Sequence, residues 1–304
     1  MSKMKILLLG KNGQVGWELQ RALQPLGEVI ALDRSINGDG LCGDIANFTV
    51  IEHVLKQVQP DIVVNATAYT AVDKAESEQD QADLINHLAV ANLAEQCKQQ
   101  NALFIHYSTD YVFNGVGTNA WAEDDIKAPI NHYGRTKRDG EIALEKSQVR
   151  FINFRTCWVY GAHGHNFIKT MLKLAQTKEE LGIIQDQVGV PTGAALIADI
   201  TAQVLRYYSL QSPEQQAVLH GHYHLAPTGE TTWYDYANYI FDQARQYGMT
   251  LAIQTVNAIA TSAYPTPAQR PLNSRLNTQK LQQTFKLHMP EWQQGVAQVI
   301  NEIL

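Results

Sequence analysis

The sequence predicts an α/β fold: a doubly wound parallel sheet with a smaller α/β lobe. Short apolar runs alternate with helical patterns through residues 1–155, an order typical of parallel sheets that carry helices on both faces. The run Ile62-Val63-Val64 is continuously apolar, as expected for a strand that is buried on both faces. Residues 156–304 alternate less regularly and predict the second lobe.

Each expected strand of the first part is a short apolar run bounded by polar residues, Gly or Pro. The helices between them are predicted from apolar residues that recur every three or four positions. One helix should begin at Asn47, a residue type that caps helix N-termini, and end before Pro60. The strands are expected at 5–9, 29–32, 61–65, 103–108 and 150–155, and the other helices at 13–24, at 79–100 and from 133 onward.

The helix expected at 79–100 places Leu84, Ile85, Leu88 and Leu93 in one helical phase. The segment 114–131, rich in Gly, Asn and Asp, has the composition of a surface loop that closes over a site. In the second half, helices are expected at 166–176, 195–208 and 231–247, and a strand at 222–225.

Composition narrows the class of protein. The formal net charge of −6 argues against nucleic acid as a partner. No apolar run approaches the roughly 20 residues that span a bilayer, and the run 5–9 is too short for a signal-peptide core. The three cysteines are sparse and widely spaced, so we expect a cytoplasmic protein with buried, inert thiols and no zinc site.

A glycine-rich loop follows the first expected strand. Gly10, Gly13 and Gly16 allow the backbone to turn sharply and to approach a pyrophosphate, while the next helix presents free N–H groups to the anion. A strand before the loop and a helix after it form the context of a Rossmann-type dinucleotide site. The alternative is a tight turn without a ligand. We therefore expect an NAD(P)-binding domain at 1–155 and a mainly substrate-binding lobe at 156–304, some of whose segments return to the first domain.

Two neighbouring residues point to different cofactors. Asp33, at the end of the second strand, is placed to bind ribose hydroxyls and favours NADH. Arg34 is placed to bind a 2′-phosphate and favours NADPH, or is a solvated surface charge. We expect both NADPH and NADH to be usable.

A phenol and an ammonium are expected one helical turn apart, in Tyr133-Gly134-Arg135-Thr136-Lys137. A lysine charge near Tyr133 should lower the pKa of the phenol from its usual value near 10. Tyr133 then donates a proton to a carbonyl oxygen while hydride reaches the carbon, and Lys137 binds the cofactor ribose. An ordinary surface pair is the alternative.

The fourth strand ends in Tyr107-Ser108-Thr109-Asp110. Ligands of open α/β sheets bind at the carboxyl ends of the strands, so Thr109 should reach the same cleft and orient a substrate carbonyl. Asp110 can accept a hydrogen bond from a sugar hydroxyl, or it caps the following turn.

This order of motifs resembles the extended short-chain dehydrogenase/reductase family, and within it the dTDP-4-dehydrorhamnose reductases. The resemblance covers about Lys5 to Leu304. Its specific stretches are GKNGQVGWELQ, YTAVDKAE, HYSTDYVFNG, FRTCWVYG, VPTGA, Thr231-Thr232-Trp233 and TSAYPTPAQRP. It implies reduction of the 4-keto group of dTDP-4-dehydro-6-deoxy-L-mannose to dTDP-L-rhamnose, a sugar of lipopolysaccharide O-antigens.

The resemblance also assigns residues. Thr109, Tyr133 and Lys137 form the implied catalytic set, and Asp110 and Trp158 contact substrate. Core packing is the alternative for Trp158. The cofactor site that the resemblance implies consists of Gly13, Gln14, Val15, Asp33, Asp44, Ile45, Ala68, Tyr69, Thr70 and Tyr107. The motifs described above add Gly10, Gly16, Arg34, Tyr133 and Lys137 to it.

A nucleotide-sugar pyrophosphate needs cations. Arg270 and Arg275 flank a proline-rich loop in the second lobe and are candidates, with structural ion pairs as the alternative. Some members of the family bind magnesium through glutamates at a dimer interface. The matching positions here are Glu18, Ala195 and Gln293, too few carboxylates for a hard cation. We expect no tightly bound metal, and the homodimer stays open.

Two other functions compete with the reductase. One is another nucleotide-sugar enzyme on the same scaffold: a different 4-ketoreductase, a 4,6-dehydratase or an epimerase. Related 4,6-dehydratases carry Asp-Glu after the strand-end Thr, but here Asp110 is followed by Tyr111, which argues against the dehydratase. A non-catalytic nucleotide-binding regulatory subunit is the alternative of another class. The presence of Thr109, Tyr133 and Lys137 together argues against it.

Overall fold

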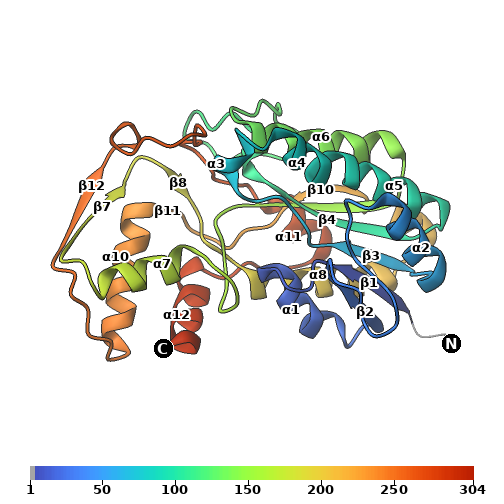
Figure 1. Cartoon of the computed structure of the whole chain (residues 1–304), viewed down its shortest axis with the longest axis horizontal. Helices are drawn as coiled ribbons and strands as arrows, with labels where there is room; N and C mark the ends of the chain where they lie inside the picture. Colours follow the sequence, from blue (N-terminus) through green and yellow to red (C-terminus); the bar gives the residue numbers. More distant parts are fainter. Residues whose placement is uncertain (1–3) are drawn as a thin grey trace.

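The computed structural model describes residues 4–304 and is built around a six-stranded parallel sheet (Figure 1). Residues 1–3, the start of the expected first domain, lie outside the described residues. The strand order is β10-β5-β4-β3-β1-β2, and every neighbouring pair is parallel. The strands are β1 (Lys5–Leu9), β2 (Glu28–Leu32), β3 (Ile62–Asn65), β4 (Leu103–Thr109), β5 (Phe151–Thr156) and β10 (Gly221–His224). The expected fold class is confirmed.

The order of strands reverses between β1 and β3. The chain runs outward from β1 to β2 and then returns across β1 to build β3, β4 and β5 in the other direction. A crevice opens at such a point, at the carboxyl ends of the strands. The glycine loop follows β1 at this point.

Alternate residues of the strands enter two separate cores, because successive side chains point to opposite faces. Leu7, Leu9 and Val63 face one side, together with α2 (Phe48–Val58), α5 (Ala89–Gln99) and α6 (His132–Ser147). Ile6, Leu8 and Val64 face the other side, together with α1 (Gln14–Leu23) and α8 (Ala194–Ser209).

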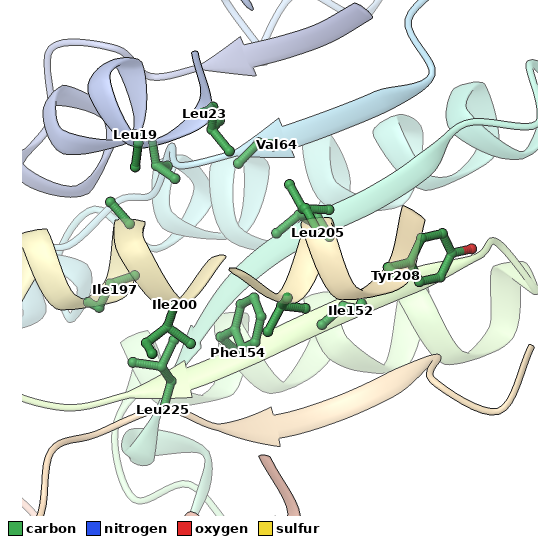
Figure 2. Close-up of a cluster of buried hydrophobic side chains, with 14 of the residues drawn as sticks. Leu19, Leu23, Val64, Ile152, Phe154, Ile197, Ile200, Leu205, Tyr208 and Leu225 are labelled. Atoms are coloured by element: carbon green, nitrogen blue, oxygen red, sulfur yellow. The ribbon is translucent and has the colours of Figure 1, made fainter. Parts of the chain in front are cut away.

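Helix α8 comes from the second half of the sequence but packs on the sheet beside α1. Figure 2 shows its Ile197 and Leu205 between Leu19 and Leu23 of α1 on one side and Phe154 of β5 on the other. Strand β10, also from the second half, pairs with β5. Two segments beyond residue 156 therefore build the sheet layer.

Leu281 and Phe285 of α11 (Gln279–Phe285) also join the sheet core. Most of the other segments beyond residue 156 form a second lobe, on the left of Figure 1. Its core joins Ile168, Tyr236, Phe241, Trp292 and Val296. The longer elements are α7 (Phe167–Ala175), β7 (Glu180–Ile184), α10 (Trp233–Gln246), β12 (Thr255–Ile259) and α12 (Trp292–Ile303), with β12 parallel to β7.

Several elements are too short to show a periodicity in the sequence. The strands of this kind are β6 (Val159–Tyr160), β8 (Val188–Gly189), β9 (Thr192–Gly193) and β11 (Thr231–Thr232). The helical segments are α3 (Val72–Ala75), η2 (Asp110–Val112), α9 (Pro213–Ala217), η3 (Thr261–Ala263) and α11 (Gln279–Phe285).

The helix expected at 79–100 is not continuous. It consists of α4 (Gln79–Asp83), a π-helical turn η1 (Leu84–Leu88) and α5. The wider turn changes the helical phase, so Leu88 is 43% exposed and the prediction of an inward-facing Leu88 was wrong. Asn86 is buried instead, and its amide bonds the backbone N–H and C=O of Tyr69 at 2.9 and 3.0 Å.

The cysteines differ in burial, and the segment expected to form a loop at 114–131 is anchored by Trp121. Cys97 and Cys157 are buried as expected, but Cys42 is only partly buried, and its thiol faces the Arg34 carbonyl at 3.2 Å. In the expected loop 114–131, Trp121 stacks on Phe113 and donates its indole N–H to the Asn273 carbonyl at 3.1 Å.

Across residues 4–304, none of the helices combines the length and apolar character needed to cross a membrane.

Candidate active site

The loop after β1 has the geometry of an anion-binding turn. Gly10 adopts a φ of 90°, which disfavours any residue with a Cβ. A Cβ on Gly16 would overlap the Gly10 carbonyl oxygen, so only glycine lets α1 begin this close to the strand. Gly13 is the N-cap of α1 and offers no side-chain cap, which leaves the first N–H groups of the helix open to an anion.

Two adjoining cavities lie along the carboxyl ends of the strands. One has a volume of about 790 Å³ and opens between the loop and the end of β2. The other has about 580 Å³ and extends from the loop to α6 and the second lobe. Five residues line both, so the two form one elongated site: Asn12, Gly13, Ala66, Thr67 and Ala68.

Most residues expected in the site line these cavities. The first cavity is lined by Gly10, Gly13, Asp33, Arg34, Asp44, Ile45, Ala68 and Tyr69. The second is lined by Gly13, Gln14, Val15, Ala68, Thr70, Tyr107, Thr109, Asp110, Tyr133, Lys137 and Trp158. Gly16 and Arg270 lie outside both linings.

Asp33 is ionised and already held at the end of β2. Its carboxylate accepts from the Ser35 N–H and from the Asn12 amide, each at 2.7 Å, and lies 3.6 Å from the Lys11 ammonium. The Ser35 N–H, followed by Asn12 and Lys11, lowers the pKa of Asp33. Arg34 is exposed beside it on the wall of the first cavity.

Tyr133 lies in the first turn of α6, at the wall of the second cavity. The Asn131 side chain caps this helix by accepting from the Gly134 N–H at 2.8 Å. Tyr133 is 8% exposed, and its ring meets Tyr111 edge-on at 5.5 Å. Burial raises the pKa of Tyr133, and the nearby Thr109 hydroxyl only partly opposes this. The expectation of a lowered pKa was therefore wrong for this structure. A neutral phenol is the form that donates a proton.

Lys137 is 2% exposed and points toward β4. Its ammonium donates to the Tyr107 carbonyl at 2.7 Å and lies 3.3 Å from Nε2 of His106. Burial lowers the pKa of Lys137 to about 8, against the charge of Glu141, which raises it. The ammonium therefore persists at neutral pH.

Thr109 and Asp110 form the end of β4. The Thr109 hydroxyl accepts from the Tyr111 N–H at 3.2 Å and donates to the Asp110 carboxylate at 3.1 Å. Asp110 is 2% exposed, and burial raises its pKa to about 7. Within the described part of the chain, Oδ2 of Asp110 has no hydrogen-bond partner, which leaves it available to a ligand hydroxyl.

Trp158 closes the far side of the second cavity. It has a φ of 47°, unusual for a bulky residue, and Gly189 packs against its ring because any side chain there would overlap it. Its indole stacks on Trp233 with centroids 3.7 Å apart. Trp233 also lines the cavity. It belongs to the matched stretch Thr231-Thr232-Trp233 and directly follows β11, but the sequence assigned it no role at the site.

Other lining residues also escaped prediction. Asn12 lies in the loop after β1, Thr156 is the last residue of β5 and Cys157 follows it, so their positions near strand ends were a usable signal. His165 and Thr67 belong to loops that only the fold brings to the cavity.

Both candidate arginines are engaged in ion pairs. Arg270 contacts Asp73 at 2.7 Å, and Arg275 contacts Glu230 at 2.5 Å. Arg270 lies close enough to Tyr111, a lining residue, to influence the pKa of its phenol. It therefore places positive charge near that lining residue without lining the cavity itself.

The residues at the family's magnesium positions do not fit a divalent cation. Glu18 lies 3.5 Å from Arg21, whose guanidinium also bonds Asp199 at 2.9 Å, so a cation already stands beside these carboxylates. Ala195 carries no ligand atom, and Gln293 does not line the cavity that Glu18 and Ala195 share. The expectation of no tightly bound metal stays a prediction.

The site can therefore bind an extended anionic ligand at the loop and place a neutral phenol, a hydroxyl and an ammonium at one end.

The family model described as the RmlD substrate binding domain matches residues 4–304. The dTDP-4-dehydrorhamnose reductase of Escherichia coli K12 is 52% identical over 300 residues, covering 99% of this chain and 98% of that protein. The reductase of Burkholderia thailandensis is 41% identical, covering 99% of each.

A solved structure agrees with these relatives. The dTDP-4-dehydrorhamnose reductase of Bacillus anthracis, determined in complex with NADP, superimposes with a TM-score of 0.88 at 31% identity, covering 99% of this chain and 100% of that chain. The family model spans the whole described chain, and the motifs, fold and relatives point to one activity. The chain belongs to the dTDP-4-dehydrorhamnose reductase family.

Proposed function

We propose that this chain uses NADPH or NADH to reduce the 4-keto group of dTDP-4-dehydro-6-deoxy-L-mannose, which forms dTDP-L-rhamnose. The observation that carries the proposal is the cluster of Thr109, Tyr133 and Lys137 on one cavity that continues into the glycine loop. In the proposal, the first cavity takes the adenosine end of the cofactor, and the second takes the nicotinamide and the sugar.

The residues around the loop fit a dinucleotide. The uncapped N-terminus of α1 suits the pyrophosphate, and the close approach at Gly10 and Gly16 leaves room for it. Asp33 suits ribose hydroxyls and Arg34 a 2′-phosphate. When bound, the reduced nicotinamide supplies the hydride that the protein itself lacks.

Tyr133 acts as the general acid in this proposal. Its neutral hydroxyl gives a proton to the carbonyl oxygen as that carbon receives hydride, which leaves an alcohol and a tyrosinate. Thr109 hydrogen-bonds the same oxygen and orients it. Lys137 binds the cofactor ribose, and its charge stabilises the tyrosinate that forms.

The second lobe provides the sugar end of the site. Trp158 and Trp233 offer an apolar surface to the sugar ring and its methyl group, and Asp110 accepts from a sugar hydroxyl. Arg270 contributes positive charge behind Tyr111. In this proposal the first domain binds the cofactor and the second lobe binds the sugar, with the boundary at residue 155 and with α8 and β10 belonging to the first domain.

The position after Asp110 speaks against a dehydratase. It holds Tyr111, whose ring packs on Tyr133, where relatives that eliminate water carry a glutamate. Cytoplasmic location stays a prediction, and the homodimer stays open.

The proposal is tested by following oxidation of NADPH and NADH with the 4-keto sugar nucleotide, in the wild type and in Tyr133→Phe. We expect turnover in the wild type and a loss of roughly two to four orders of magnitude in the variant. Turnover unchanged by the substitution would remove Tyr133 from its role. Absence of turnover with both cofactors would contradict the reductase itself.

A further inference from the structure

A row of buried polar side chains crosses the sheet behind Lys137. Asn65 of β3, His106 of β4, Asn153 of β5 and His222 of β10 are direct neighbours in the strand register. Residues aligned in this way in a parallel sheet share one face. The first three are at most 1% exposed, so a polar layer takes the place of an apolar core under part of α6.

The side chains of this row contact one another and also contact α6 through polar atoms. The Asn65 amide lies 3.3 Å from Nδ1 of His106, and the Asn153 amide lies 2.9 Å from Nδ1 of His222. The Asn153 amide also reaches Glu141 of α6 at 3.4 Å. His106 is the member that contacts the catalytic lysine, at 3.3 Å from Nε2 to the ammonium.

The protonation state of His106 follows from its surroundings. Burial, followed by the charge of Lys137, holds the pKa of His106 well below its usual value, so the imidazole is neutral. An ammonium has only donors, so Nε2 must carry the lone pair and Nδ1 the hydrogen. The Asn65 atom that lies 3.3 Å from Nδ1 is the amide nitrogen, a donor, since Oδ1 of Asn65 accepts from the N–H and the hydroxyl of Thr67. The tautomer therefore follows from the Lys137 contact and not from Asn65.

This arrangement uses two of the three N–H groups of Lys137. One goes to the Tyr107 carbonyl at 2.7 Å and one to His106. The third remains for the cavity, whose wall Lys137 shares with Tyr133. We propose that His106 is a positioning residue that holds the Lys137 ammonium in place for the cofactor ribose. This inference rests on the proposed role of Lys137.

The charged groups around Lys137 do not replace this contact. On α6, Glu141 is paired with Arg155 of β5 at 2.8 Å. From η2, Asp110 is directed to Thr109. His224 of β10 lies near Arg155, at 3.3 Å, and His222 lies 3.0 Å from Glu145. Tyr133 is neutral. Among residues 4–304, the imidazole of His106 is therefore the polar side chain that contacts the ammonium directly.

The experiment compares His106→Leu with His106→Gln, whose side-chain oxygen can still accept from Lys137. Removing an acceptor disfavours the ammonium, so its pKa falls further and the basic limb of the kcat/KM profile moves to lower pH. For His106→Leu we expect this shift and a loss of roughly 10- to 100-fold in kcat/KM for NADPH. We expect His106→Gln to return the basic limb to its wild-type pH and to restore most of kcat/KM for NADPH.

The matched control is His224→Gln. His224 is equally buried on the same strand face but contacts Arg155, so its variant should keep the wild-type limb. Thermal unfolding of each variant establishes that it is folded. A folded His106→Leu with the wild-type profile would overturn the proposal. Equal losses in both His106 variants with an unmoved limb would overturn it too, since that pattern indicates packing alone.

A second measurement determines the tautomer of His106 in the wild type, without an activity assay. In ¹⁵N NMR spectra of the histidine-labelled wild type, His106 should show a protonated Nδ1 and an unprotonated Nε2, and Lys137→Met should shift Nε2. A hydrogen on Nε2 would contradict the contact. If Lys137→Met retained full activity while the tautomer was as expected, the proposed function of Lys137 would fail and the contact would stand.

Discussion

The indole rings of Trp158 and Trp233 stack with their centroids 3.7 Å apart and their planes 18° apart, at the wall of the sugar end of the site. Trp233 is held from behind, because its N–H donates to the Gln187 amide oxygen at 3.1 Å. The two rings come from segments 75 residues apart in the chain (233 minus 158) and form a rigid apolar surface. Such a surface is suited to the methyl-bearing side of a 6-deoxy sugar.

Trp233→Ala should therefore weaken binding of the sugar nucleotide. The loss of an aromatic pair, about 0.5–1.5 kcal/mol, corresponds to an increase in its KM of roughly 2- to 12-fold. The KM for NADPH should change little. Trp233→Phe, which retains a ring, is the matched control and should lie near the wild type. Equal increases in both KM values would show a general collapse of the cavity instead.

The KM for the sugar should depend on pH near neutrality through Asp110. Burial raises the pKa of this carboxyl to about 7, so it is neutral below that pH and charged above it. A carboxylate is the stronger acceptor for a sugar hydroxyl. The KM should fall as pH rises through 7, and Asp110→Asn should remove this dependence. A pH-dependent KM that persists in the variant would assign the titration to another group.

Arg34 should contribute mainly to the binding of NADPH, and Asp33 mainly to the binding of NADH. Arg34→Ala removes the cation available to a 2′-phosphate, so the KM for NADPH should rise roughly 10- to 100-fold while that for NADH stays within a factor of about two. Asp33→Asn should act more strongly on NADH. Parallel changes for both cofactors in Arg34→Ala would indicate that Arg34 is only a surface charge.

The buried ion pair between Glu141 and Arg155 should be needed for stability. Their side chains are 0% and 1% exposed and lie 2.8 Å apart. Burial would raise the pKa of Glu141, but Arg155 outweighs it and lowers the pKa to about 2. Because this pKa lies below that of an unfolded glutamate, the stabilisation exists above about pH 4.5 and is lost as pH falls toward 2.

Glu141→Gln leaves the Arg155 charge buried without its partner. The free energy of unfolding in urea should fall by about 3–5 kcal/mol at neutral pH. The control is Glu52→Gln, which removes the surface pair with Lys56, whose side chains are 44% and 65% exposed, and should cost less than about 1 kcal/mol. Similar losses in the two variants would argue against the buried pair.

Activity should not depend on a divalent cation. Arg21 stands beside Glu18 and Asp199, and Ala195 offers no ligand atom. Turnover measured with a chelator and with added magnesium should agree within a factor of about two. A chelator that abolishes activity, reversed by magnesium, would contradict this reading of the cavity.

The sequence alone determined the parts of this protein that depend on local order. The strands from Lys5–Leu9 to Phe151–Thr156, the glycine loop and the four-residue spacing of Tyr133 and Lys137 follow from periodicity and turn chemistry, which act over a few residues. The strand ends predicted that Thr109 and Asp110 lie at the cavity, because the carboxyl ends of parallel strands share one edge.

Only the tertiary structure decided what depends on distant segments. The return of α8 and β10 to the sheet, the stacking of Trp233 under Trp158 and the row from Asn65 to His222 join residues far apart in the chain. The raised pKa of Tyr133 likewise comes from burial, which no local pattern reports. Contacts of this kind leave no periodicity in the sequence, because each partner satisfies only its own local geometry and the pairing is made by the fold.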